Sequence, residues 1–159
     1  MTPADAETYR KYADELVRFA SGLVGPSGAE DVVANAVLRA VAGRQWSRVD
    51  NQRAYLYRAV LNEATSQHRA TTRRLNREMH AYQRDVSAGS ASSDSGGSSV
   101  DFDVLVALRR LSERQRAVIH LTYWADLPAT DIASLLDLPT RTVERELSRA
   151  RTRLEELLS

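Results

Sequence analysis

Residues 130–154 read TDIASLLDLPTRTVERELSRARTRL, and the spacing of their apolar side chains predicts a helix-turn-helix. Apolar residues gather in 130–136, which predicts a short helix, and Asp137-Leu138-Pro139 supplies a turn with a helix-breaking proline. Thr140 is the expected N-cap of a longer helix whose apolar stripe has helical period. Such a pair of helices places the second one in the major groove of DNA. The stripe consists of Val143, Leu147, Ala150, Leu154 and Leu157.

The longer helix has a polar outward face. At about 100° per residue, an inward apolar stripe turns Arg141, Arg145 and Arg149 outward. Arginine can bind guanine with two hydrogen bonds, and a hydroxyl near the helix start can bind phosphate. An ordinary solvated helix face is the alternative, but the turn upstream favours contact with DNA. The candidate DNA-binding residues are Thr140, Arg141, Thr142, Arg145, Ser148 and Arg149.

Two further helices precede this motif. The apolar residues between Phe102 and Leu111 predict the first, and Ser112 with Gln115 forms a capping box at the start of the second. Before them, residues 86–99 contain seven serines, three glycines and one aspartate, a composition typical of a flexible linker. We therefore expect domains over 1–85 and 101–159, joined by a linker over 86–100.

The first domain is also predicted to be helical. Apolar residues recur with helical period over 9–23, and Ser27 with Glu30 has the spacing of a capping box before a second helix over about 28–42. A loop containing Trp46 follows, and Asp50 is the expected cap of a third helix. Because no stretch alternates convincingly between apolar and polar residues, the expected fold is all-α, with two small helical domains.

Composition excludes several classes of function. The chain has 159 residues, no cysteine and three scattered histidines, so thiol catalysis and a metal centre are not expected, and no cofactor is implied. It shows no Gly-rich phosphate loop and no paired carboxylates beside a nucleophile, so we do not expect an enzyme. The absence of a long apolar run or a signal-like start favours a cytoplasmic protein without membrane insertion.

The net charge of +1 hides an uneven distribution. Residues 51–85 hold seven basic and three acidic side chains, a net charge of +4, and Lys11 is the only lysine among the 22 basic residues. The planar fork of arginine suits phosphate and guanine. Codon bias in a GC-rich genome explains an excess of arginine equally well, so the positions of the arginines carry the argument.

Motifs in both halves resemble one known family. The segments AEDVV (29–33), LRA (38–40) and LYR (56–58), followed by LSERQR (111–116) and LSRAR (147–151), are similar to bacterial RNA polymerase sigma factors of the extracytoplasmic-function type. These proteins consist of little more than the domains called sigma-2 and sigma-4. The resemblance covers nearly the whole chain apart from the linker, and implies transcription initiation at specific promoters.

The resemblance implies a role for each surface. The polymerase core would be the partner through its β′ coiled coil and β flap, with Asp31, Asn35 and Arg39 contacting the coiled coil, and an anti-sigma factor is a further partner the family allows. The last helix would bind the −35 element of promoter DNA. Trp46 is a candidate for base capture but equally a core residue. The implied −10 contacts are Trp46, Tyr55, Arg58, Asn62 and Arg69, with Arg73 and Arg74 on phosphates.

Several residues depart from the family pattern. Ala34 and Asn35 stand where glutamine and an acid are usual, and Glu144 and Glu146 stand where basic residues are usual. These departures leave open an alternative function, a sigma-like helix-turn-helix regulator or protein-binding decoy that does not initiate transcription with polymerase.

The linker length sets how the two domains can bind DNA. About 16 residues span roughly 20–24 Å as a coil and about 50–58 Å when extended. Two DNA sites two helical turns apart are about 70 Å apart, so only a nearly stretched linker lets both domains reach them. In the free protein we expect the domains either to tumble independently or to pack together.

Overall fold

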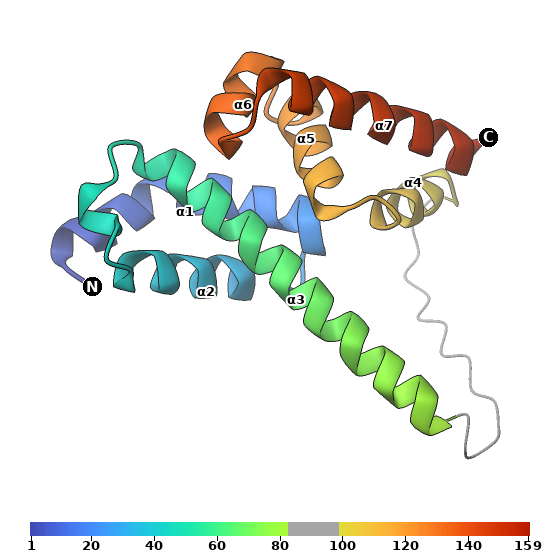
Figure 1. Cartoon of the computed structure of the whole chain (residues 1–159), viewed down its shortest axis with the longest axis horizontal. Coiled ribbons are helices and arrows are strands. Elements are labelled where there is room, and N and C mark those ends of the chain that lie inside the picture. Colours follow the sequence, from blue (N-terminus) through green and yellow to red (C-terminus); the bar gives the residue numbers. More distant parts are fainter. Residues whose placement is uncertain (83–98) are drawn as a thin grey trace.

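A computed structural model of the chain describes residues 1–82 and 99–159, and every regular element within them is helical (Figure 1). This confirms the predicted all-α fold. The predicted linker lies outside the described residues, except that Ser99 and Val100 belong to a helix. The elements are α1 (Pro3–Val24), α2 (Ala29–Ala42), the 3-10 helix η1 (Trp46–Arg48), α3 (Gln52–Tyr82), α4 (Ser99–Arg109), α5 (Glu113–Tyr123), α6 (Ala129–Leu136) and α7 (Thr140–Leu158).

The sequence predicted some helix starts correctly and others wrongly. The capping box of Ser112 and Gln115 is present at α5, as predicted. The one predicted at Ser27 is wrong, because Gly28 is the N-cap of α2 and makes no side-chain capping bond. At α3 the side chain of Asn51, rather than Asp50, accepts from the backbone N–H of Ala54 at 3.0 Å.

The two ends of the chain differ from expectation as well. A capping box between Thr2 and Asp5 starts α1 at Pro3, well before the predicted Tyr9. Thr140 is the first residue of α7 and not its cap, because Pro139 occupies the N-cap position. The apolar stripe over 9–23 contains the buried residues of α1, whereas the helix itself begins about a turn and a half earlier.

Helices α1, α2 and α3 pack around one another and share a core. Leu16 and Phe19 of α1, Val33 of α2 and Val60 of α3 are almost completely buried in it. The amphipathic pattern of α2 leaves its polar side on the surface, on the far side of the body from α5, α6 and α7 (Figure 1). Its outward face is therefore available to a partner.

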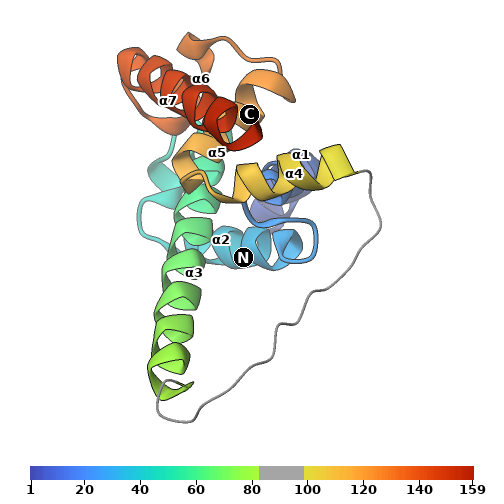
Figure 2. The same ribbon diagram turned by 90° about the vertical axis from the view of Figure 1, so that its right-hand side faces the viewer.

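Helices α5, α6 and α7 pack on one another and also on the first three helices. The core is continuous across this junction, since Leu121 of α5 and Ile132 of α6 belong to the same buried cluster as Phe19 and Leu56. Helix α5 lies against α1, and α6 lies against α3 (Figure 2). The described parts of the chain thus form one closed body, the second of the two arrangements expected for the free protein.

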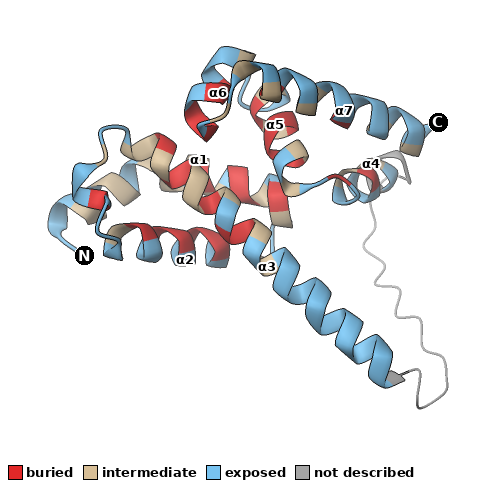
Figure 3. Cartoon of the chain, in the orientation of Figure 1, coloured by how far each residue is buried: buried red, intermediate tan, exposed pale blue. Residues whose placement is uncertain are grey.

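The second half of α3 projects away from this body. Every side chain described from His68 to Ala81 is exposed (Figure 3). We call residues 68–82 the α3 arm. Its first residue, His68, lies 3.4 Å from Glu113 of α5, and apolar Leu75 and Met79 are 50% and 63% exposed on it. Such an exposed arm is suited to bind a partner. Within the described residues, no helix is both long and apolar enough to cross a membrane.

Candidate functional site

The predicted outward face of α7 is exposed as the sequence indicated. Val143 and Ala150 are completely buried, whereas Arg141, Arg145 and Arg149 lie on the surface with Ser148. Thr140 and Thr142 are half-buried at the helix start. The expected pair of Glu146 and Arg149 is present with its nearest nitrogen and oxygen 3.9 Å apart. The face therefore presents three exposed arginines, of which Arg149 is paired with Glu146, beside the exposed carboxylate of Glu144.

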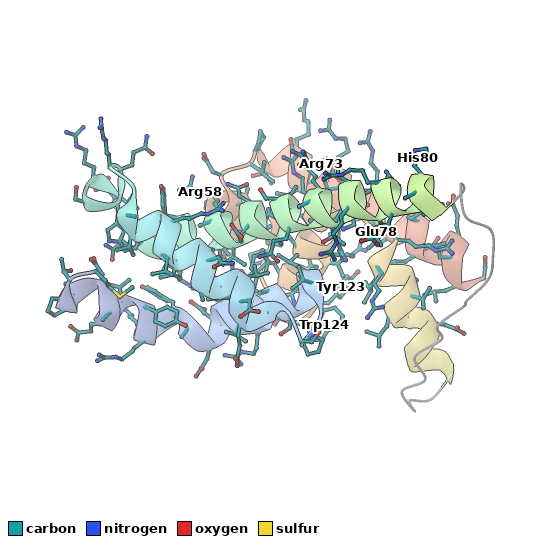
Figure 4. All side chains as sticks on the ribbon, turned by 90° about the horizontal axis from the view of Figure 1, so that it is seen from below. Arg58, Arg73, Glu78, His80, Tyr123 and Trp124 are labelled. Atoms are coloured by element: carbon teal, nitrogen blue, oxygen red, sulfur yellow. The ribbon has the colours of Figure 1, made fainter. Side chains whose placement is uncertain are left out.

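A side-chain contact between Arg151 and Tyr123 holds α7 against α5. Arg151 donates from Nε to the hydroxyl of Tyr123 at 2.7 Å, and its guanidinium lies over the Tyr123 ring, 5.6 Å from the centroid. Tyr123 and Trp124 lie next to one another at the end of α5 (Figure 4). The sequence analysis missed this pair, because no local pattern links residues 28 positions apart.

The outward face of α2 brings the three predicted polymerase contacts together. Asp31, Asn35 and Arg39 follow one another at intervals of four residues and are all exposed. Leu38 beside them is 57% exposed, an apolar side chain on an otherwise polar face that sequence analysis also missed. Arg39 pairs with Glu63 of α3, with Nη1 and Oε2 3.1 Å apart.

The α3 arm carries the predicted phosphate contacts. Arg69, Arg73 and Arg74 are exposed along it, and Asn62 is exposed just before it. Figure 4 shows Arg73 and His80 along this arm. The Nε atoms of Arg73 and Arg77 lie 3.4 Å from the carbonyl oxygens four residues earlier, so these side chains run along the helix. The arm is a cationic surface long enough to follow a nucleic-acid backbone.

Trp46 lies in the core and not on the surface. Its ring is 6% exposed and lies 6.0 Å from the ring of Tyr55, while its indole N–H donates to Asp5 Oδ1 at 2.8 Å. This hydrogen bond is the main reason why the pKa of Asp5 lies below its usual value, with Thr2 adding to it. Of the two interpretations left open for Trp46, the closed body favours the core residue, because an enclosed indole cannot stack on a base.

Arg58 is engaged by the turn of the helix-turn-helix. Its Nη1 lies 3.1 Å from Oδ2 of Asp137, its guanidinium lies 5.7 Å from the Tyr55 ring centroid, and its Nε is buried without a partner. Asp137 has the left-handed backbone angle φ 54° at the end of α6, which brings the chain round into α7. A residue predicted to contact the −10 element and the motif predicted to bind the −35 element are therefore in contact with each other.

His120 fills the junction between α5 and α1. Its ring stacks on Trp124 with centroids 5.9 Å apart and meets the Phe19 ring edge-on at 5.8 Å. A methyl group added at Gly22 would lie 2.7 Å from His120 Nδ1, so the glycine permits this approach. Burial, and then the charge of Arg18, lower the pKa of His120 from its ordinary value.

A groove of about 1180 Å³ runs along this junction between α1, α3, α4 and α5. Glu113 lies in it, 3.0 Å from Arg116 and 3.4 Å from His68 across the junction. Burial raises the pKa of the Tyr57 hydroxyl, also in the groove, to about 12. Among the residues the structure describes, no three histidine, aspartate or glutamate side chains group as a metal site would need.

Comparison with known proteins links both halves to one kind of protein. The family model for sigma-70 region 2 matches residues 8–74, and the model for sigma-70 region 4 matches residues 101–154. The chain is 30% identical over 156 residues to an RNA polymerase sigma-E factor of Streptomyces avermitilis, covering 96% of this chain and 83% of that protein. A sigma-E factor of Streptomyces antibioticus is 29% identical over 157 residues, with the same coverage.

A solved structure is similar over almost the whole chain. The sigma factor RpoE from Bartonella quintana, crystallised in complex with the anti-sigma factor NepR, has a TM-score of 0.64 and 27% sequence identity. The match covers 99% of this chain and 98% of that one.

Proposed function

The chain belongs to the sigma-70 family and directs RNA polymerase in transcription initiation, and from this premise we propose how its surfaces divide that task. The observation that carries the proposal is the separation of three exposed polar surfaces on three helices. They are the outward face of α2, the α3 arm and the outward face of α7. Each presents a different chemistry, and each falls within or beside one of the two matched regions.

The outward face of α2 is proposed to dock on the β′ coiled coil of the polymerase core. Asp31, Asn35 and Arg39 supply charged and amide contacts, and exposed Leu38 supplies apolar area beside them. Mixed faces of this kind, with an apolar side chain next to polar ones, suit a protein partner better than DNA. The closed body leaves this face open, so the core can bind before any rearrangement. The β flap is the corresponding proposed partner of residues 101–159.

The α3 arm is proposed to hold the −10 element. Arg69, Arg73 and Arg74 neutralise phosphates, and Asn62 contacts bases of the opened strand. Opening duplex costs about 1.4 kcal/mol per base-pair step, and captured bases return about 1–3 kcal/mol each. Tyr55 and Arg58 join this surface once Asp137 has left Arg58, and Trp46 joins it only if η1 leaves the core.

The N-terminal half of α7 is proposed to bind the −35 element. Arg145 and Arg149 lie where a helix in the major groove meets base edges, and Thr140 lies at the helix start where phosphate binds. Glu144 is exposed on the same turn and reduces the general attraction for phosphate. The chain is therefore expected to gain less affinity from charge and more from fitting a particular sequence.

The closed body has to open for both DNA surfaces to work together. Helix α6 packs on α3, and Asp137 contacts Arg58, so the −35 motif lies directly against the −10 surface. The two promoter elements are about 70 Å apart. We therefore propose that core polymerase, bound through α2, separates residues 101–159 from the first three helices.

An anti-sigma factor is a further proposed partner. The Bartonella quintana relative was crystallised with one. In the present chain the groove between α1, α3, α4 and α5 combines apolar walls with arginines, which suits an amphipathic acidic segment.

Transcription in vitro tests the proposal. Core polymerase with this chain should give a promoter-dependent run-off product from genomic fragments, and the chain should co-purify with the core. Binding to DNA alone, with neither co-purification nor a product, would contradict it and favour a regulator that does not initiate transcription.

A further inference from the structure

Glu63 is a buried acidic residue on the side of α3 that packs against α2. Among the described residues only two charged side chains are buried, Glu63 with 6% exposure and Arg116 with 9%. Arg116 has Glu113 one turn away on its own helix. Glu63 instead forms its ion pair with Arg39 of α2, across the interface between α2 and α3. A carboxylate in such a place is retained only when donors satisfy it.

Each oxygen of Glu63 has a polar partner close by. Oε2 lies 3.1 Å from Nη1 of Arg39, and Oε1 accepts from Nε2 of Gln67 at 3.2 Å. Gln67 lies one turn further along α3 and holds the carboxylate from the side of its own helix. The acid is therefore fixed at both oxygens, and its position is set by the α2–α3 core and not by solvent.

The pair is unequal in exposure. The Glu63 side chain is 7% exposed and the Arg39 side chain 76%. In the other pair that crosses between helices of the first domain, Arg53 and Glu15 are 39% and 28% exposed. The guanidinium of arginine carries five N–H donors, and the Arg39 side chain is largely exposed, so donors remain accessible to a partner. A buried acid thus anchors a long side chain that would otherwise sample many rotamers in water.

We infer that Glu63 is a positioning residue for polymerase docking: it fixes Arg39 so that its accessible donors meet a carboxylate or carbonyl group of the polymerase core. The inference rests on the proposed docking role of α2. Its physical basis is preorganisation, since the cost of ordering the Arg39 side chain is met when the protein folds and not when it binds.

The role of Glu63 is tested by measuring the affinity of the full chain, labelled at its N-terminus, for core polymerase. Arg39→Ala should weaken binding because it removes the contact itself. Glu63→Gln should weaken it by about 2- to 12-fold, the cost of ordering one long side chain. The double variant should bind no more weakly than Arg39→Ala, because Glu63 acts only through Arg39.

Two further variants separate positioning from folding. Glu63→Met fills a similar volume without charge and leaves no buried unpaired charge, because the side chain of Arg39 is exposed to solvent. It should therefore fold and still show the loss of affinity. Glu15→Gln breaks a comparable pair away from the outward face of α2 and should bind as the wild type does. Thermal unfolding of each variant reports the folded fraction used in the binding measurement.

The outcomes are distinct. The inference is supported if Glu63→Gln and Glu63→Met each weaken binding in the wild-type chain but cause no further loss in a chain that already carries Arg39→Ala. Wild-type affinity of both Glu63 variants while Arg39→Ala is weakened overturns it, and so does a Glu63 effect that persists without Arg39. Wild-type affinity of Arg39→Ala overturns the proposed docking role of Arg39 itself, and the inference with it.

Discussion

At the scale of single residues, the arginines differ in what they are placed to contact. Arg145 projects from the first turns of a helix with a buried stripe, where base edges are reached. Arg73 is exposed on the α3 arm, where we propose that it offers its charge to a phosphate backbone. The same residue type should therefore give different binding behaviour at the two positions.

Replacing Arg145 with alanine should weaken promoter binding by about 1–3 kcal/mol on matching sequences and leave unrelated sequences little changed. Arg73→Ala should lower affinity for all sequences alike and reduce the slope of log affinity against log salt by about one. Fluorescence anisotropy with several duplexes, each titrated at several salt concentrations, distinguishes the two. Equal losses for both variants on every duplex would contradict this division.

His120 makes the closed body sensitive to pH. Its pKa is lowered in the closed body by burial and by Arg18, so protonation favours the state in which the ring is released. Closure should be independent of pH well above the ordinary value of 6.5 and weaken as the pH falls through it. Energy transfer between labels on α1 and α6, followed from pH 8 to pH 5, measures this.

The variant His120→Phe keeps an aromatic ring against Phe19 and Trp124 but carries no proton. It should lack the weakening of closure at low pH that the wild type shows. Identical pH profiles for this variant and the wild type would show that His120 is not the sensitive group.

At the scale of elements, the sequence predicted best what depends on near neighbours. The capping box at Ser112 and the outward face of α7 follow from spacing of three and four residues, and both are present. The cap at Ser27 failed because Gly28 occupies that position, and α1 began early because Thr2 and Asp5 cap it. Trp46 could not be placed, since the Asp5 carboxylate that binds it comes from another element.

The packing of α5 against α1 depends on the absence of a side chain at Gly22. Gly22→Ala would place a methyl group 2.7 Å from the His120 ring, and overpacking of this kind costs about 1–3 kcal/mol. The same change favours the helix itself by about 0.5–1 kcal/mol, so α1 should stay helical while the junction loosens. Reduced energy transfer between α1 and α6, with unchanged far-ultraviolet circular dichroism, is the expected result.

Gly28→Ala is the matched control, because its added methyl group would lie 3.6 Å from Val24, an ordinary contact. Its energy transfer should equal that of the wild type. Equal transfer in the Gly22→Ala variant as well would mean that the α1–α5 contact does not hold the body closed.

At the scale of the whole molecule, the closed body packs together two helical segments that the sequence separates. Composition separates two helical segments by a serine-rich stretch, and two sigma-70 regions match on either side of it. Closure itself depends on contacts such as Arg58 with Asp137 and Gly22 with His120, between residues about 80 to 100 positions apart, which no local pattern reveals. The closed body engages Arg58 yet leaves the outward face of α2 exposed, so the proposed roles of these surfaces predict that polymerase binding precedes promoter binding.

The distance between the two halves during initiation tests this account most directly. The chain has no cysteine, so Glu7→Cys on α1 and Ser134→Cys on α6, both at exposed positions, accept a donor and an acceptor dye. We predict high energy transfer in the free protein and a large fall in the complex with core polymerase and promoter. Unchanged high transfer in a complex that produces run-off transcript would contradict it.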